Sequence, residues 1–246
     1  MNVAKAVKHI SRQELRTDQV QEALSHGAEA VLTHKSTLIY TIIIIAVIAG
    51  AVFGWRFYAQ RQSVKAEAGF SDAMQTYNAV VVGQGQPPQP NEVTYSDANK
   101  KYQDALRKFQ AVAKEYPRTH PGQLADYYAA LCETHLGQNA QAAELLNKLA
   151  GGSDKDFAAM ARFQLAQIDD QTGKSAQAVQ LYNQILQSPS VLVPKPVVLL
   201  ALAAHYEKTD PAQAAKLYQQ IKTEYPDTTA ADQADQQLAL LPTGKS

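Results

Sequence analysis

The chain has almost no cysteine, no excess of either charge and no sequence motif of the common catalytic sites. Its single cysteine, Cys132, excludes an internal disulfide, so oxidation does not hold any domain of the chain together. The 23 basic and 23 acidic side chains balance, and overall charge therefore indicates neither nucleic acid nor a strongly acidic partner. Without a Gly-x-Ser-x-Gly or dinucleotide-binding motif, we predict a non-enzymatic protein that binds no cofactor.

Potential metal ligands and acid–base pairs are equally scarce. The closest grouping is Cys132, Glu133 and His135, which offers a helical i, i+3 pair where a metal site usually has three or four ligands. Asp169 and Asp170 are adjacent and point in different directions on a helix, unlike a paired-carboxylate site. We predict no metal and no catalytic residue, and we interpret the two aspartates as part of a solvated polar face.

Charge is missing altogether from Ser36 to Trp55. At about 1.5 Å per residue, a helix of this length spans the roughly 30 Å hydrocarbon core of a bilayer. We therefore predict a transmembrane helix over residues 36–58. The residues predicted to lie at the two membrane interfaces are Tyr40, Trp55, Arg56, Phe57 and Tyr58.

Cleavage as a signal peptide is the alternative, because Ala49, Gly50 and Ala51 form a small-residue site. The long preceding segment and the apolar residues that continue to Trp55 favour the anchor. Ala46, Gly50 and Gly54 are four residues apart, a pattern that lets a second spanning helix approach closely and would allow homo- or hetero-oligomers. The flanking Lys and Arg residues do not decide the orientation.

The remaining organisation follows from composition and periodicity. Residues 1–35 are predicted to be an amphipathic head, and residues 59–82 a juxtamembrane helix. Residues 83–95 are rich in glycine and proline and are predicted to be a loop. Residues 96–242 consist mostly of strong helix formers, so the fold class is all-α.

A period of 36 residues runs through this last segment. Three sets of aligned residues recur at this one period, alanine in one set and large apolar residues in the other two, which indicates stacked copies of one helical hairpin. The residues predicted to pack in the repeats are the close-crossing Ala142, Ala178 and Ala214, followed by the large side chains Leu146, Tyr182, Tyr218, Leu149, Ile185 and Ile221.

The predicted turns lie between the copies. Gly137 and Gly173 fit helix C-termini, and Asp210 followed by Pro211 fits a helix start. Ser153 with Asp156 is interpreted as a capping box. A half unit ending at Glu115-Tyr116-Pro117 comes before the first copy, and Glu224-Tyr225-Pro226 repeats that ending.

This alternation of small, small, large and proline resembles the tetratricopeptide repeat, although the usual period there is 34. Ala130 and Ala166 occupy a small position of that repeat, whereas the third copy has Leu202. The whole arrangement, with Gly54-Trp55-Arg56-Phe57-Tyr58 at the end of the span, resembles the bacterial single-span inner-membrane tetratricopeptide proteins ancillary to the Sec translocon.

The resemblance implies a cytoplasmic head and a periplasmic repeat domain. It also implies that translocon subunits or newly exported proteins are partners, in a chaperone or scaffold role. We therefore expect a membrane-anchored helical solenoid that binds other proteins and the lipid bilayer, and no nucleic acid. A cytoplasm-facing scaffold and a soluble exported repeat protein are the alternatives.

Overall fold

A computed structural model describes residues 35–82 and 93–241. The head predicted for residues 1–35, apart from Lys35, and most of the loop predicted for residues 83–95 lie outside the described residues. The chain divides into two compact units, residues 1–60 and 61–246, and each is described by itself. It is mostly helical, with a long apolar helix followed by stacked helical hairpins, so the predicted fold class is confirmed.

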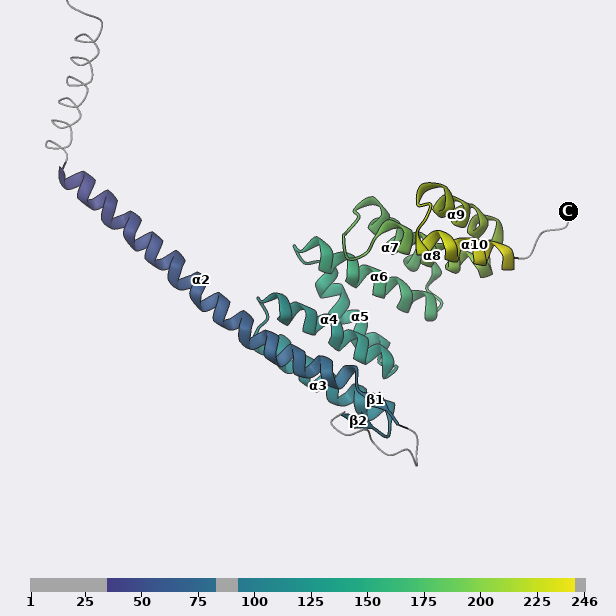
Figure 1. Cartoon of the computed structure of the whole chain (residues 1–246), viewed down its shortest axis with the longest axis horizontal. Coiled ribbons are helices and arrows are strands. Elements are labelled where there is room, and N and C mark those ends of the chain that lie inside the picture. The colour runs from purple at the N-terminus through teal and green to yellow at the C-terminus, as the bar shows by residue number, and fades with distance from the viewer. Residues whose placement is uncertain (1–34, 83–92, 242–246) are drawn as a thin grey trace, which may run out of the picture. The chain divides into compact units, whose positions relative to one another are not determined.

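The described part of the first unit belongs to α2 (Lys35–Tyr77), a continuous helix that extends into the second unit (Figure 1). Every side chain over residues 39–60 is exposed. Within the described ranges, α2 is the one helix that is long and apolar enough to cross a membrane. A helix that is apolar on every face needs an apolar surrounding, which is consistent with a single membrane span or a signal segment.

The second unit is built from helices that pack against their neighbours in sequence (Figure 1). Val80–Val81 (β1) and Thr94–Tyr95 (β2) form a short parallel pair. The remaining helices of this unit are α3 (Ala98–Glu115), α4 (His120–His135), α5 (Asn139–Ala150), α6 (Lys155–Gln171), α7 (Ser175–Gln187), α8 (Lys195–Thr209), α9 (Pro211–Glu224) and α10 (Thr229–Leu240).

The first hairpin of this unit begins within α2. Ala66 and Ala73 of α2 are fully buried in one core with Phe109 of α3. A Cβ added at Gly69 would lie 2.9 Å from Val112 Cγ2, so the two helices approach closely there. The segment interpreted as a half unit is therefore the second helix of a complete hairpin, whose first helix is residues 61–77 of α2.

The predicted turns have a clear local basis. Gly137 and Gly173 have φ of 74° and 79°, the left-handed conformation that glycine adopts without strain at helix C-termini. Asp210 caps α9 by accepting a hydrogen bond from the backbone N–H of Gln213 at 3.0 Å. These three predictions are confirmed.

The start of α6 differs from the prediction. Asp154, not Ser153, is the N-cap residue, and its Oδ1 accepts hydrogen bonds from the backbone N–H groups of Asp156 at 2.9 Å and Phe157 at 3.2 Å. The capping box predicted from Ser153 and Asp156 was therefore wrong. Both Ser and Asp are good caps, and the choice between neighbours depends on where the chain leaves the preceding turn.

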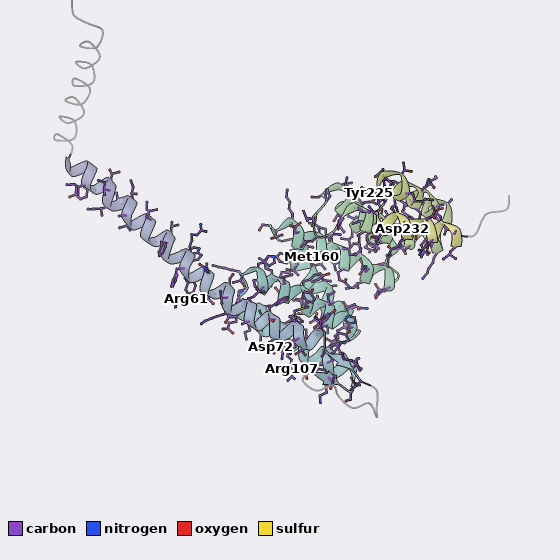
Figure 2. All side chains as sticks on the ribbon, in the orientation of Figure 1. Arg61, Asp72, Arg107, Met160, Tyr225 and Asp232 are labelled. Atoms are coloured by element: carbon purple, nitrogen blue, oxygen red, sulfur yellow. The ribbon has the colours of Figure 1, made fainter. Side chains whose placement is uncertain are left out.

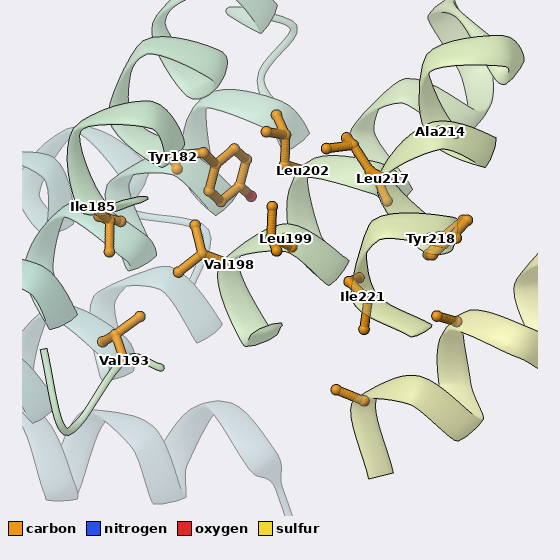
Figure 3. Close-up of a cluster of buried hydrophobic side chains, with 14 of the residues drawn as sticks. Tyr182, Ile185, Val193, Val198, Leu199, Leu202, Ala214, Leu217, Tyr218 and Ile221 are labelled. Atoms are coloured by element: carbon orange, nitrogen blue, oxygen red, sulfur yellow. The ribbon is translucent and has the colours of Figure 1, made fainter. Parts of the chain in front are cut away.

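The hairpins are held together by apolar side chains at the 36-residue repeat positions. All nine predicted repeat-packing residues are buried, and the alanines Ala142, Ala178 and Ala214 are fully so. Figure 3 shows the core between α7, α8 and α9, where Tyr182 and Ile185 lie near Val198 and Leu199 of α8. The alanine positions let the helices cross closely, and the large residues fill the space between successive hairpins.

Candidate functional site

Helices α6, α7 and α8 surround an open groove of about 470 Å³. Its walls come from two successive hairpins, so no single repeat could form it. The residues that line it are predominantly polar: Gln167, Asp170, Gln171, Ser175, Tyr182, Ala201, Ala204, His205, Lys208 and Thr209.

Asp170 is held in this groove from two sides. Its Oδ2 accepts a hydrogen bond from the hydroxyl of Tyr182 at 3.0 Å, and its Oδ1 lies 2.5 Å from Nδ1 of His205. The His205 side chain is only 7% exposed. Asp170 is therefore a fixed part of the groove. The interpretation of Asp169 and Asp170 as a solvated face was wrong for both, because their side chains are 14% and 23% exposed.

Asp169 has a different ion-pair partner from Asp170. Its Oδ1 lies 3.5 Å from Nζ of the exposed Lys174, across the turn that ends α6. The two carboxylates thus point to different partners, as adjacent residues of a helix should. Only the partners of Asp170, which come from α7 and α8, make it a groove residue.

The contact between tyrosine and carboxylate occurs in two successive hairpins. The Tyr218 hydroxyl donates to Oε1 of Glu207 at 2.6 Å, as the Tyr182 hydroxyl does to Asp170. Burial, and then the neighbouring carboxylate, raises the pKa of Tyr182 above its ordinary value, so its hydroxyl stays a donor. The sequence signal was an acidic residue 11 or 12 positions before each repeated tyrosine. The first copy hides this signal because Leu146 occupies the tyrosine position.

Replacement of Tyr182 by Phe tests the fixed position of Asp170. The variant keeps the ring in the core and removes one of two hydrogen bonds to a half-buried carboxylate. We expect a loss of about 1 kcal/mol in the free energy of unfolding, measured by urea denaturation. Tyr225→Phe is the matched control, because the hydrogen bonds found for Tyr225 within the described residues involve its backbone and not its hydroxyl. Equal stability of both variants would contradict the assigned contact.

The exposed rim of the groove can donate and accept hydrogen bonds. Gln167 and Gln171 are one turn apart on α6, and Lys208 and Thr209 lie opposite on α8. Amide side chains pair well with the backbone of an extended peptide, because each offers both a donor and an acceptor. The arrangement therefore favours recognition of a polar segment over enclosure of a small apolar ligand.

The cysteine and histidine considered as metal ligands have other roles. Cys132 is fully buried in the core of the first hairpins, and burial raises the pKa of its thiol to about 12. The ring of His135 stacks on Tyr102 with centroids 4.1 Å apart. Within the described residues, no group of three or more His, Cys, Asp or Glu side chains is placed to hold a metal ion.

Glu133 is a buried carboxylate with an oxygen atom that lacks a hydrogen-bond partner among the described residues. The residue is 5% exposed, and the atom without a partner is Oε2. Burial, and then the nearby Glu144, raises the pKa of Glu133. The folded chain therefore binds this proton more tightly than the unfolded chain, so folding is favoured at low pH and weakened as pH rises through the folded-state pKa.

The Glu133→Gln variant should be more stable than the parent chain at pH 8, by roughly 1 kcal/mol, because it removes a poorly solvated charge. The difference should shrink toward pH 4, where the parent carboxyl is protonated. Thermal melting of both chains across this pH range is the measurement. A gain that stays constant with pH would show that ionisation of Glu133 is not its cause.

The residues predicted for the membrane helix all lie on α2. Ala46, Gly50 and Gly54 are exposed, and a Cβ added at either glycine would meet no atom within 4 Å. The predicted interface residues Tyr40, Trp55, Arg56, Phe57 and Tyr58 are also exposed.

Comparison with known families gives two matches. A family model described as a tetratricopeptide repeat-like domain matches residues 34–190, which is more than half of the chain. A second, described as a tetratricopeptide repeat, matches residues 198–228. A comparison with curated proteins finds no match. The first match spans α2 to α7, which form the first three hairpins. The second covers most of α8 and all of α9.

Proposed function

Because the chain belongs to the tetratricopeptide repeat-like domain family, we propose that it is a membrane-anchored module that binds a segment of another protein between α6 and α8. Repeats of this kind usually serve as non-catalytic binding modules, since stacked hairpins present an extended surface.

The polar groove with a fixed carboxylate is the observation that carries the proposal. Asp170 is positioned before any ligand arrives, because Tyr182 and His205 hold it. A site that is already ordered loses less conformational entropy on binding. The amides of Gln167 and Gln171 would pair with the backbone of the bound segment, while Asp170 and Lys208 would select its side chains.

The proposed partners are subunits of the Sec translocon and newly exported proteins, and the role is that of a chaperone or scaffold. Resemblance of the single-span architecture to the ancillary translocon proteins supports these partners. The same resemblance supports a location in the bacterial inner membrane with the repeat domain at the periplasmic face. Ala46, Gly50 and Gly54 would then face another spanning helix, and Trp55 and Tyr58 would lie at the headgroups.

Site-specific photo-crosslinking tests the groove and the partners together. A photoreactive residue is placed at Gln171 or Lys208, which line the groove, and at Gln184, an exposed residue of α7 that does not. We expect adducts from the first two positions only, identified by mass spectrometry as translocon subunits or exported proteins. Equal yields of adducts from all three positions would refute the proposal that the groove is the binding site. Adducts with cytoplasmic proteins alone would refute the proposal that translocon subunits or exported proteins are the partners.

Protease accessibility tests the orientation. In intact spheroplasts, added protease should cut residues 96–242 if they face the periplasm, and should leave them intact in a cytoplasm-facing scaffold. The mass of the mature N-terminus separates an anchored chain from a soluble exported one, since cleavage after Ala51 would remove most of the apolar run.

A further inference from the structure

The exposed face of α3 carries a regular row of cations. Lys100, Arg107 and Lys114 follow one another at seven-residue steps, so they lie within about 40° of arc around the helix. They lie opposite the buried face of α3, which is centred on Phe109. The Arg107 side chain is 77% exposed. Figure 2 labels its position on α3.

Two amides complete the row. Gln103 and Gln110 are exposed and lie along one edge of the same face, each between two cations. Cations and amides therefore alternate along the helix at steps of about 5 Å. We call these five residues the cation–amide row: Lys100, Gln103, Arg107, Gln110 and Lys114.

A hollow of about 740 Å³ lies beside the first half of the row. Its α3 side includes Lys100, Gln103 and Arg107 together with two carboxylates, and Leu136 and Gln138 from the turn between α4 and α5 form the other side. Of these carboxylates, Asp97 caps α3 by accepting from the backbone N–H of Lys100, and Asp104 pairs with Arg107. The row thus has an adjoining surface with an apolar side chain and a further amide. A bound chain could pack against this surface as well as against the cations.

The charges of the row are only partly compensated. Helix α3 has five cations against two carboxylates, an excess of three positive charges. Arg107 pairs with Asp104 at 2.5 Å, but within the described residues no carboxylate lies at ion-pair distance from Lys100 or Lys114. This concentration of positive charge is hidden in a chain whose net charge is zero.

We propose that the cation–amide row binds an acidic peptide segment in an extended conformation. The cations repeat every 10 Å or so along α3. An extended peptide in the polyproline II conformation advances about 9 Å over three residues, and every third side chain returns to the same face. Carboxylates at every third residue would therefore meet Lys100, Arg107 and Lys114 in turn. Gln103 and Gln110 would hydrogen-bond to the peptide backbone between them.

The spacing favours a peptide over nucleic acid as the occupant. Each strand of a duplex carries a phosphate about every 3.4 Å, far more densely than the cations of the row. A dense polyanion would also meet the carboxylates of Asp104 and Glu115, which lie along the other edge of the row. A peptide with spaced carboxylates can pass along the amide edge, away from Glu115, and the carboxylate of Asp104 is paired with Arg107.

Binding of two labelled synthetic peptides to the full chain in detergent micelles tests the proposal by fluorescence anisotropy. Both peptides have the same composition, but one has glutamate at every third residue and the other has its glutamates clustered. The triple variant Lys100→Glu, Arg107→Glu and Lys114→Glu should raise the Kd of the spaced peptide at least about tenfold. The control variant makes the same charge change at the exposed Lys155, Lys195 and Lys216. This control should alter the Kd by less than about twofold.

Further binding measurements test which kind of molecule the cation–amide row binds. The parent chain should bind the spaced peptide more tightly than the clustered one, and added salt should weaken this binding. Gln103→Ala with Gln110→Ala should raise the Kd about threefold. Equal binding of the two peptides, or equal effects of the two triple variants, would overturn the proposal. Tighter binding of a single-stranded oligonucleotide or of anionic vesicles than of the spaced peptide would overturn it as well.

Discussion

A chain that begins at Ser96 is expected to melt about 10 °C below a chain that begins at Arg61. The shorter chain lacks residues 61–77 of α2, which form the first helix of the first hairpin. Ala66 and Ala73 would be lost from the core, together with the half-buried Phe70 and Tyr77. Burial of these side chains contributes roughly 4 kcal/mol, and the shorter chain would expose Phe109 on α3.

Thermal melting followed by circular dichroism is the measurement, and two point variants of the longer chain separate packing from chain length. Phe70 lies in ring contact with Phe109 and Tyr128, with centroids 5.7 and 5.6 Å away, so Phe70→Ala should reproduce a large part of the loss. Glu67→Ala, at an exposed position of the same helix, should change the melting temperature by no more than about 2 °C. Two chains of equal stability would show that residues 61–77 are not part of the repeat core.

Ala178→Leu is expected to destabilise the chain by about 3 kcal/mol. Ala178 is fully buried where α7 packs closely in the core of the last two hairpins, so three additional carbon atoms must push neighbouring side chains or helices apart. Urea denaturation of the variant and its parent measures the difference in the free energy of unfolding.

The matched control is Ala176→Leu, because Ala176 is exposed on the same helix two residues earlier. This variant should remain within about 0.5 kcal/mol of the parent. Ala142→Leu and Ala214→Leu should destabilise the chain by a similar amount. Both alanines lie one repeat period away from Ala178 and are also fully buried. If Ala178→Leu left the free energy of unfolding unchanged, the assignment of the repeated alanine to a close helix crossing would be refuted.

The repeat could be predicted because its signal is local and periodic. Alanine at 142, 178 and 214 recurs at a fixed distance, and the glycines at 137 and 173 mark the turns between helices. A hairpin needs a small residue at its crossing and a left-handed residue at its turn, whatever else the chain does. These requirements act on a few neighbouring residues, so they can be recognised without knowing the fold.

The groove could not be predicted in the same way. Asp170 meets Tyr182 and His205, which lie 12 and 35 residues further along the chain. On its own helix it resembles Asp169, and only the stacking of α6, α7 and α8 separates the two. A local pattern shows that a helix has a polar side, but not which polar residue the next hairpin covers.

The first hairpin shows the same limit. The apolar face of residues 61–77 indicates that this segment packs, and not that α3 is its partner. The cation–amide row is a further example, because the burial of Phe109 on the opposite side decides which face of α3 remains exposed. Overall charge balance gives no indication of it.

The sequence by itself determined a charge-free helix followed by helical hairpins with a 36-residue period, because length, hydropathy and turn chemistry are properties of consecutive residues. Only the tertiary structure decided that α2 supplies a helix of the first hairpin, that Asp170 is fixed in a groove and that one face of α3 is positively charged. Each of these depends on contacts or burial across separate helices, and the order of residues along one helix does not specify which faces meet.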